Sequence, residues 1–281
     1  MPSLTSARRR EPRPGKRNLR LAVATGITLG ALVAGLLYLG PPAFFGLAFV
    51  VILIAQGEFY LATRKAGMAP AAALGLVAGG ILMLGVFYRG EAAAGIVVFL
   101  AVVSSFVWFL ALPPAARGIT NITTTIFGIA YIPFLGSFAA LLAARPHDGR
   151  GVTIVALAAT VMYDVLAYAG GSRFGRTPLA PRISPNKTVQ GAAIATGGLV
   201  ALMVLIAPAL GPWSRWESLV LGLVIAGMAP AGDLFESMLK RDLGIKDMGT
   251  IFPGHGGALD RIDAMLFVVP AVYFSLKVFG Y

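Results

Sequence analysis

The chain has 281 residues, of which 57% are hydrophobic and only 12% are charged, with a formal net charge of +11. Its mean hydropathy is +0.81, whereas a soluble domain carries about 25% charged residues. This composition excludes an ordinary soluble domain, and the absence of cysteine excludes disulfides, thiolate metal sites and cysteine nucleophiles. The basic excess is spread over short segments between apolar runs, so we interpret it as a membrane-topology signal and not as a nucleic-acid-binding surface.

Apolar runs recur along almost the whole chain. Residues 1–18 contain six basic residues among prolines and are predicted to form a disordered basic cytosolic tail. The run 21–39 is too long for the apolar region of a signal peptide and is expected to remain as an anchor. Further spans are expected at 44–62, 70–88, 92–110, 123–143, 152–170, 189–210, 218–233 and 262–279. The sequence therefore predicts an all-α, polytopic integral membrane protein with about nine transmembrane helices.

The distribution of Lys and Arg predicts the orientation. With the N-terminus inside, 18 of the 23 basic residues lie on the inner side of the membrane. Positive residues favour the cytosolic side, so the expected orientation is N-terminus in and C-terminus out. We divide the chain into the tail, an N-terminal part with helices one to five (19–145) and a C-terminal catalytic part with helices six to nine (146–281).

Half of the acidic residues gather in one short stretch near the C-terminus. Six of the twelve lie between Asp233 and Asp263, among four Lys and Arg residues and the turn Gly254-His255-Gly256-Gly257. Charged residues set among membrane helices are costly and usually functional. This stretch is therefore the first candidate for a site.

The predicted topology brings carboxylates from three helices to one depth. Asp164 lies about 18 Å into its inward crossing, and Asp233 ends the next inward helix. Asp260 and Asp263 share a face in the first turn of the last helix. Carboxylates that converge at low dielectric repel each other unless a cation joins them. Oxygen ligands without cysteine are typical of Mg²⁺, which takes one or two carboxylates together with substrate phosphates.

Phosphate-binding features surround these carboxylates. Ser237 and Lys240 follow Asp233 at i+4 and i+7 and line the same helix face. The glycine turn 254–257 precedes a helix N-terminus, where backbone N–H groups bind phosphate, and His255 is expected to donate to it. Residues 184–188 (Ser-Pro-Asn-Lys-Thr) offer a second basic, hydroxyl-rich loop.

Each feature also has a purely structural interpretation. Asp233 with Lys240, or Asp260 with Arg261, would form salt bridges at helix ends, and His255 would cap the turn. Residues 184–188 would be an inner loop that ends in a Ser-Pro turn. Their combination favours a site that binds a nucleotide or polyphosphate beside a lipid. A lipid phosphate that attacks a nucleotide phosphorus needs no strong general base, because it is already anionic.

The stretch 237–263 follows the pattern S-x2-K-R-x4-K-D-x-G-x3-P-G-H-G-G-x2-D-R-x-D and closely resembles the signature of phosphatidate cytidylyltransferases (CDP-diacylglycerol synthases). Shorter matches at 164–171, 174–176, 184–188 and 232–237 extend the resemblance over about residues 160–265. Helices one to five resemble the family only in apolar character and in Glu58, Arg64 and Gly67. The sequence departs from the family pattern at four positions, namely Tyr163, Asn186, Gln190 and Ala258.

The resemblance implies a homodimeric enzyme of the bacterial cytoplasmic (inner) membrane with its active site facing the cytosol. Its substrates would be CTP and phosphatidic acid, its products CDP-diacylglycerol and pyrophosphate, and its cofactor Mg²⁺ with a monovalent cation such as K⁺. By position, Asp233 and Asp260 would bind the metal. The catalytic residues implied are Asp233, Asp260, Lys240, Arg241 and His255. The substrate-binding residues implied are Ser184, Lys187, Thr188, Ser237, Asp164, Lys246, Asp247, Gly256, Gly257, Arg261 and Asp263.

Two other functions stay open from the residues alone. Intramembrane charge near helix breaks is also typical of a transporter or channel for an anionic solute, although no polar path continues outward beyond Asp164. A different CTP-dependent lipid kinase would use the same nucleotide but transfer its terminal phosphate. Release of pyrophosphate or of CDP distinguishes the kinase from the cytidylyltransferase.

Overall fold

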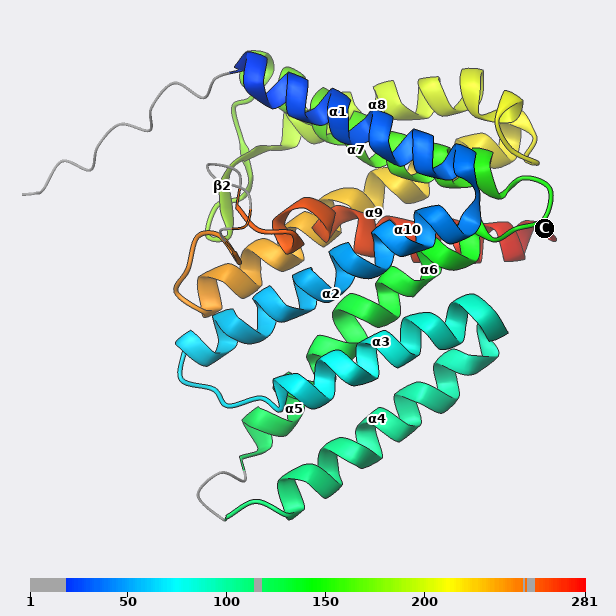
Figure 1. Ribbon diagram of the computed structural model, residues 1–281. Coiled ribbons are helices and arrows are strands. Elements are labelled where there is room, and N and C mark those ends of the chain that lie inside the picture. Colours follow the sequence, from blue (N-terminus) through cyan, green and yellow to red (C-terminus); the bar gives the residue numbers. More distant parts are fainter. Residues whose placement is uncertain (1–18, 114–117, 250, 252–255) are drawn as a thin grey trace, which may run out of the picture.

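The computed structural model describes residues 19–113, 118–249, 251 and 256–281, and these form an all-α membrane protein (Figure 1). In chain order the helices are α1 (Leu19–Leu39), α2 (Pro41–Lys65), α3 (Ala72–Arg89), α4 (Ala92–Leu110), α5 (Ile119–Ile129), α6 (Leu135–Ala143), α7 (Gly149–Phe174), α8 (Val189–Ile206), α9 (Arg215–Asp242) and α10 (Leu259–Phe279). A π-helical turn, η2 (Ala130–Phe134), joins α5 to α6, and a 3-10 turn, η3 (Ala207–Ala209), follows α8.

Within the described ranges, eight helical segments are long and apolar enough to cross a membrane. The segment Ile119–Ala143 is one of them and contains α5, η2 and α6. In α1, the apolar stretch Thr28–Leu39 is shorter than these segments. The predicted fold class is therefore confirmed, while the count of nine spans and the orientation of the chain stay predictions. The predicted tail, 1–18, lies outside the described residues.

Residues 184–188 form a strand, and the prediction of a loop there was wrong. β1 (Pro178–Ala180) and β2 (Ser184–Thr188) make a two-stranded antiparallel hairpin between α7 and α8. Pro178 pairs with Thr188, and Ala180 pairs with Ser184. Proline is tolerated here because a two-stranded hairpin consists only of edge strands. The hairpin brings the basic segment back toward the helix ends.

The helix that carries Asp233 is longer than the apolar run predicted. α9 begins after a capping box, in which the Ser214 side chain accepts from Glu217 N and the Glu217 side chain accepts from Ser214 N. It continues to Asp242, nine residues beyond the predicted end at 233. The apolar run ends where the first charged residues begin. The helix itself continues, because its polar residues lie on faces that pack against other elements. Ser237 and Lys240 therefore lie on the helix, as their spacing from Asp233 predicted.

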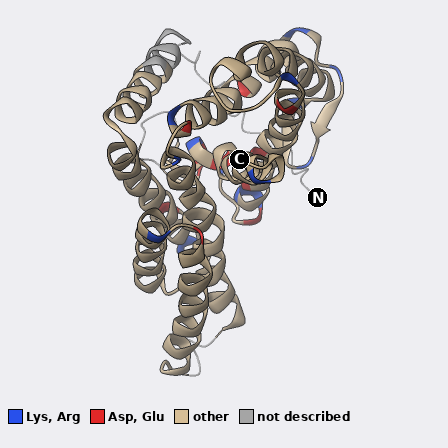
Figure 2. Ribbon diagram, turned by 90° about the vertical axis from the view of Figure 1, so that its right-hand side faces the viewer, with Lys and Arg blue, Asp and Glu red and all other residues tan. Residues whose placement is uncertain are grey.

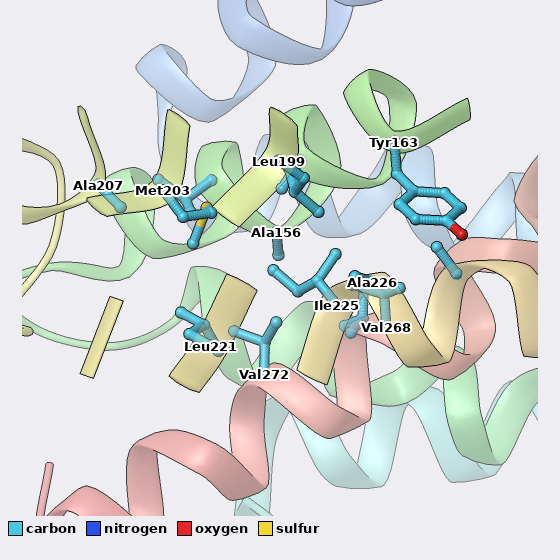
Figure 3. Packing of buried hydrophobic residues seen from close by; sticks show 14 of the residues in the cluster. Ala156, Tyr163, Leu199, Met203, Ala207, Leu221, Ile225, Ala226, Val268 and Val272 are labelled. Atoms are coloured by element: carbon cyan, nitrogen blue, oxygen red, sulfur yellow. The ribbon is translucent and has the colours of Figure 1, made fainter. Parts of the chain in front are cut away.

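Residues from α7, α8, α9 and α10 form the largest buried cluster (Figure 3). In Figure 3, Leu199 and Met203 of α8 lie close to Ala156 of α7, and Ile225 of α9 lies near Val268 of α10. All five side chains are buried. Alternation of small and large apolar residues lets membrane helices approach closely. This packing holds α9 and α10 side by side.

A second buried cluster joins the first and last parts of the chain. It includes Phe59 of α2, Tyr131 of η2 and Leu266 of α10, together with Met248 of the α9–α10 connection and Leu259 at the start of α10. The helices therefore form one continuous packed body. The division at residue 145 into an N-terminal and a catalytic part stays a prediction.

Four segments meet at one end of the bundle (Figure 1). The C-terminal ends of α2 and α9, the start of α10 and the hairpin lie toward the left of the view, and the C-terminus lies at the opposite end. Figure 2 shows that Asp, Glu, Lys and Arg are sparse on the helices, most of which are tan. Most of the described charged residues in α9 and α10 lie toward the end that the hairpin approaches.

Candidate active site

Asp233 links α9 to the hairpin. Lys187 of β2 forms an ion pair with the Asp233 carboxylate, and the two side chains are 28% and 29% exposed. Ser237, one turn further along α9, donates from Oγ to Asp233 Oδ1 at 3.3 Å. The predicted common face of Asp233 and Ser237 is therefore observed, and the basic segment 184–188 reaches the same carboxylate.

Lys240 links α9 to α10. Its Nζ donates to Asp260 Oδ1 at 2.8 Å and also forms an ion pair with Glu236. The Glu236 side chain is fully buried, whereas Lys240 keeps 15% of its side chain exposed. The structural pairs considered from the sequence had Asp233 with Lys240 and Asp260 with Arg261. In the structure, Asp233 pairs with Lys187, and Asp260 pairs with Lys240.

Asp260 also organises the connection between α9 and α10. Its Oδ2 accepts from Met248 N at 3.0 Å and from Gly257 N at 2.8 Å. Gly256 has a φ of +83°, in the left-handed region that favours glycine. Gly256 therefore has a structural reason to be glycine.

The other predicted carboxylates lie in the same electrostatic environment. Asp263 Oδ1 accepts from Ala264 N at 2.8 Å, and its carboxylate interacts electrostatically with Asp233 and Lys240. Asp164 of α7 is exposed and interacts electrostatically with Lys187 and Asp233. The convergence of carboxylates from α7, α9 and α10, predicted from topology alone, is observed. We call Asp164, Asp233, Glu236, Asp260 and Asp263 the acidic cluster.

Several predicted residues have local structural partners. Arg241 is exposed and donates from Nε to Ile183 O at 3.4 Å, which ties the end of α9 to the hairpin turn. Thr188 caps α8, because its Oγ1 accepts from Gly191 N at 3.2 Å. Ser184 is half-buried in β2. These contacts place the three side chains at the hairpin without assigning them a ligand.

The remaining predicted residues are exposed or lie outside the described residues. Lys246, Asp247 and Arg261 are exposed. His255 lies outside the described residues, so its predicted role stays a prediction.

Sequence reasoning assigned no role to Glu236 or Glu58, and both are buried in the structure. Glu236 joins the acidic cluster through Lys240. Glu58 of α2 accepts from Leu259 N at 3.0 Å, immediately before Asp260. The sequence contained a feature that could have indicated each residue as part of the site. Glu236 is three residues from Asp233, and Glu58 is an acidic residue in the middle of an apolar run.

Tyr131 is a further unassigned residue beside the acidic cluster. It lies in η2, where Pro133 cannot donate to the helical ladder and the turn widens. Its ring packs edge-on against Phe235 of α9, with centroids 5.1 Å apart. Its buried hydroxyl has no hydrogen-bond partner among the described residues and interacts electrostatically with Glu236 and other acidic groups.

Gln190 explains one departure from the family pattern. Its Oε1 accepts from the backbone N–H groups of Arg176 and Thr177, at 3.0 and 3.1 Å. The side chain therefore fixes the start of the hairpin. Tyr163, another departure, is buried in the main cluster. Neither residue contacts the acidic cluster through a polar bond in the described structure.

The donors present suit a hard cation that shares its coordination with a ligand. Across the part of the chain that the structure describes, no three His, Cys, Asp or Glu side chains form a ready-made metal cage. Mg²⁺ usually takes only one or two carboxylates and completes its shell with water and substrate phosphates. One oxygen of buried Glu236 has no partner among the described residues. Asp233 and Asp260, which lie on the adjacent helices α9 and α10, fit this ligand requirement.

Comparison with known proteins agrees with this chemistry. The sequence profile of the cytidylyltransferase family matches residues 20–279. The chain belongs to this family. It is 35% identical over 274 residues to a phosphatidate cytidylyltransferase of Mycobacterium leprae, covering 91% of this chain and 86% of that protein. A phosphatidate cytidylyltransferase of Synechocystis is 34% identical over 273 residues, covering 87% and 92% of the two chains.

Membership of the cytidylyltransferase family makes this chain a nucleotidyltransferase enzyme of the membrane. The match includes helices α1 to α6, for which the sequence motifs offered little support. The resemblance recognised from residues 160–265 is therefore confirmed over nearly the whole chain. Neither the transporter nor the lipid kinase is favoured by these relatives.

Proposed function

We propose that this chain transfers CMP from CTP to phosphatidic acid, which yields CDP-diacylglycerol and pyrophosphate. The observation that carries the proposal is the pairing of Lys187 and Lys240 with the acidic cluster at one end of the helices. Two cations interleaved with carboxylates provide both phosphate-binding and metal-binding groups. The names of the relatives support the choice of substrates.

In the proposed reaction, a phosphate oxygen of phosphatidic acid forms a bond to the α-phosphorus of CTP. The bond from that phosphorus to the oxygen bridging the β-phosphate breaks, and pyrophosphate leaves with the electron pair. Lys187, Lys240 and Ser237 would bind phosphate oxygens and orient the two substrates. The acidic cluster would hold Mg²⁺ through Asp233 and Asp260. When bound, Mg²⁺ neutralises charge on the transferred phosphoryl group and on the leaving pyrophosphate.

We further propose that this site faces the cytosol of a bacterial cytoplasmic membrane, where CTP is available. The bias of basic residues toward the end with the site supports this orientation. A monovalent cation such as K⁺ and a homodimer stay predictions from the family resemblance.

The direct test uses purified full-length protein in detergent–lipid micelles with radiolabelled CTP, phosphatidic acid and Mg²⁺. The expected products are a lipid-linked CMP and one equivalent of pyrophosphate. Release of CDP with a pyrophosphorylated lipid would instead identify a kinase. Absence of any labelled lipid, under conditions in which the Mycobacterium leprae relative is active, would refute the proposal.

A further inference from the structure

Glu58 is a buried carboxylate in the part of the chain with no assigned chemistry. It lies in α2, and only 4% of it is exposed. Its Oε2 accepts from Leu259 N at 3.0 Å, across 201 residues of sequence. Leu259 begins α10 and directly precedes Asp260. A contact from α2 thus reaches the residue next to a proposed metal ligand.

Two glycines enclose the same carboxylate. Both lie within the segment that connects α9 to α10. A Cβ atom at Gly257 would lie 2.6 Å from Glu58 Cδ, and one at Gly249 would lie 2.8 Å from Glu58 Cγ. Real Cβ atoms essentially never approach so closely, so both backbone segments are packed directly onto Glu58.

Asp260 holds the other side of these backbone segments. Its Oδ2 accepts from the N–H groups of Met248 and Gly257. Met248 directly precedes Gly249, and Gly249 and Gly257 are the two glycines packed on Glu58. Its Oδ1 accepts from Lys240. Residues 248–249 and 257 of the α9–α10 connection therefore lie between Glu58 and Asp260.

Simple helix packing does not require a charged group at this place. Burial of a carboxylate within a membrane-spanning helix is costly, and apolar contacts from Phe59 already join α2 to this cluster. The backbone N–H of Leu259 at the start of α10 is one of the donors that a helix cannot satisfy internally. An acceptor from α2 both satisfies this donor and defines where α10 begins.

We propose that Glu58 is a positioning residue, which fixes the start of α10 so that Asp260 is aimed at Lys240. This inference rests on the proposed function for its kinetic consequence. It assigns the N-terminal helices an indirect part in catalysis, because a displacement of about 1 Å in a catalytic group costs about 10²-fold in rate.

The test compares Glu58→Ala, which removes the acceptor, with Glu58→Gln, which keeps an acceptor of the same reach. Gln56→Ala is the matched control. Gln56 is fully buried on the same helix, but it donates to Gly75 O at 2.9 Å and does not contact α10 by a hydrogen bond. Each variant is assayed for kcat and for the KM of CTP per folded molecule, and for amide hydrogen exchange in peptides covering 256–264.

For Glu58→Ala we expect about a 10²-fold loss of kcat per folded molecule and faster exchange at Leu259. Glu58→Gln should recover most of the wild-type kcat and most of the protection from exchange at Leu259. Gln56→Ala should keep near-wild-type kcat and exchange per folded molecule. Wild-type kcat in Glu58→Ala would overturn the proposal, as would an equal loss in Gln56→Ala or a failure of Glu58→Gln to recover activity.

If the proposed function is wrong, the wild-type protein will transfer no CMP, and this result is distinct from a failure of the positioning role. The exchange comparison would then decide the positioning role alone, and unchanged exchange at Leu259 in Glu58→Ala would overturn it.

Discussion

Lys240 Nζ lies 2.8 Å from Asp260 Oδ1 and joins the end of α9 to the first turn of α10. The same ammonium group pairs with Glu236, whose side chain is fully buried. One cation therefore compensates two carboxylates on different helices. This arrangement makes Lys240 both a candidate phosphate-binding residue and a structural requirement of the site.

Replacing Lys240 by Met should destabilise the protein strongly. The change leaves buried Glu236 and Asp260 without their cation, and loss of one partner from a buried pair costs about 3–5 kcal/mol. The control is Lys277→Met, which breaks an exposed pair with Glu91 in which the side chains are 43% and 51% exposed. Exposed pairs contribute about 0–1 kcal/mol. Unfolding in detergent should separate the two variants clearly; equal effects would contradict the assignment of Lys240 to a buried pair.

Asp260→Asn tests the proposed metal role. The amide keeps the size of the side chain and can still accept from a backbone N–H, but it loses the charge that a divalent cation requires. We expect CMP transfer to fall at least about 10²-fold while the melting profile shows a folded protein. Glu91→Gln, at the opposite end of the helices, is the control. Turnover close to wild type in Asp260→Asn, at several Mg²⁺ concentrations, would refute the metal role.

Gly257→Ala should act through Glu58. The new methyl group would collide with the Glu58 carboxylate, and such overpacking costs about 1–3 kcal/mol. Gly197→Ala, in α8 with no atom within 4 Å of the added carbon, should be neutral or slightly stabilising. In the double variant with Glu58→Ala, the penalty of Gly257→Ala should be reduced. A double-mutant cycle of melting measurements detects this coupling, and strict additivity would argue against the contact.

The pH dependence of stability should include a contribution from Asp148, in the loop before α7. Arg145 donates to it at 2.8 and 2.9 Å and holds its pKa below the ordinary value of 3.8. A lowered folded-state pKa stabilises the protein above the unfolded-state value, and this stabilisation is lost as the pH falls through the lowered folded-state pKa. Thermal melting in detergent, measured from about pH 6 down to the lowest pH that the protein tolerates, follows this loss of stability.

Asp148→Asn is the comparison for this pH series. It should be less stable than the wild type above about pH 4, and the difference should shrink at lower pH. A difference that stays constant across the series would show that the Asp148 charge contributes nothing.

Local sequence patterns predicted the parts that depend on composition and spacing. Asp233 and Ser237 share a helix face because four residues make about one turn, and Asp260 lies in the first turn of α10 as expected. The apolar span predicted at 218–233 ends before α9 does, because an apolar run ends where charges begin, whereas the helix continues to Asp242. The strand at Ser184–Thr188 was missed because its pairing with β1 is a property of the hairpin and not of five residues alone.

The sequence by itself determined an apolar, multi-helix membrane protein with a concentration of charges near its C-terminus, because hydropathy and spacing act locally along the chain. Only the tertiary structure decided which charges meet. Lys187 pairs with Asp233 across 46 residues, and Glu58 reaches Leu259 across 201. Such contacts depend on how α2, the hairpin, α9 and α10 pack in three dimensions, and no periodicity within one helix specifies its partner on another.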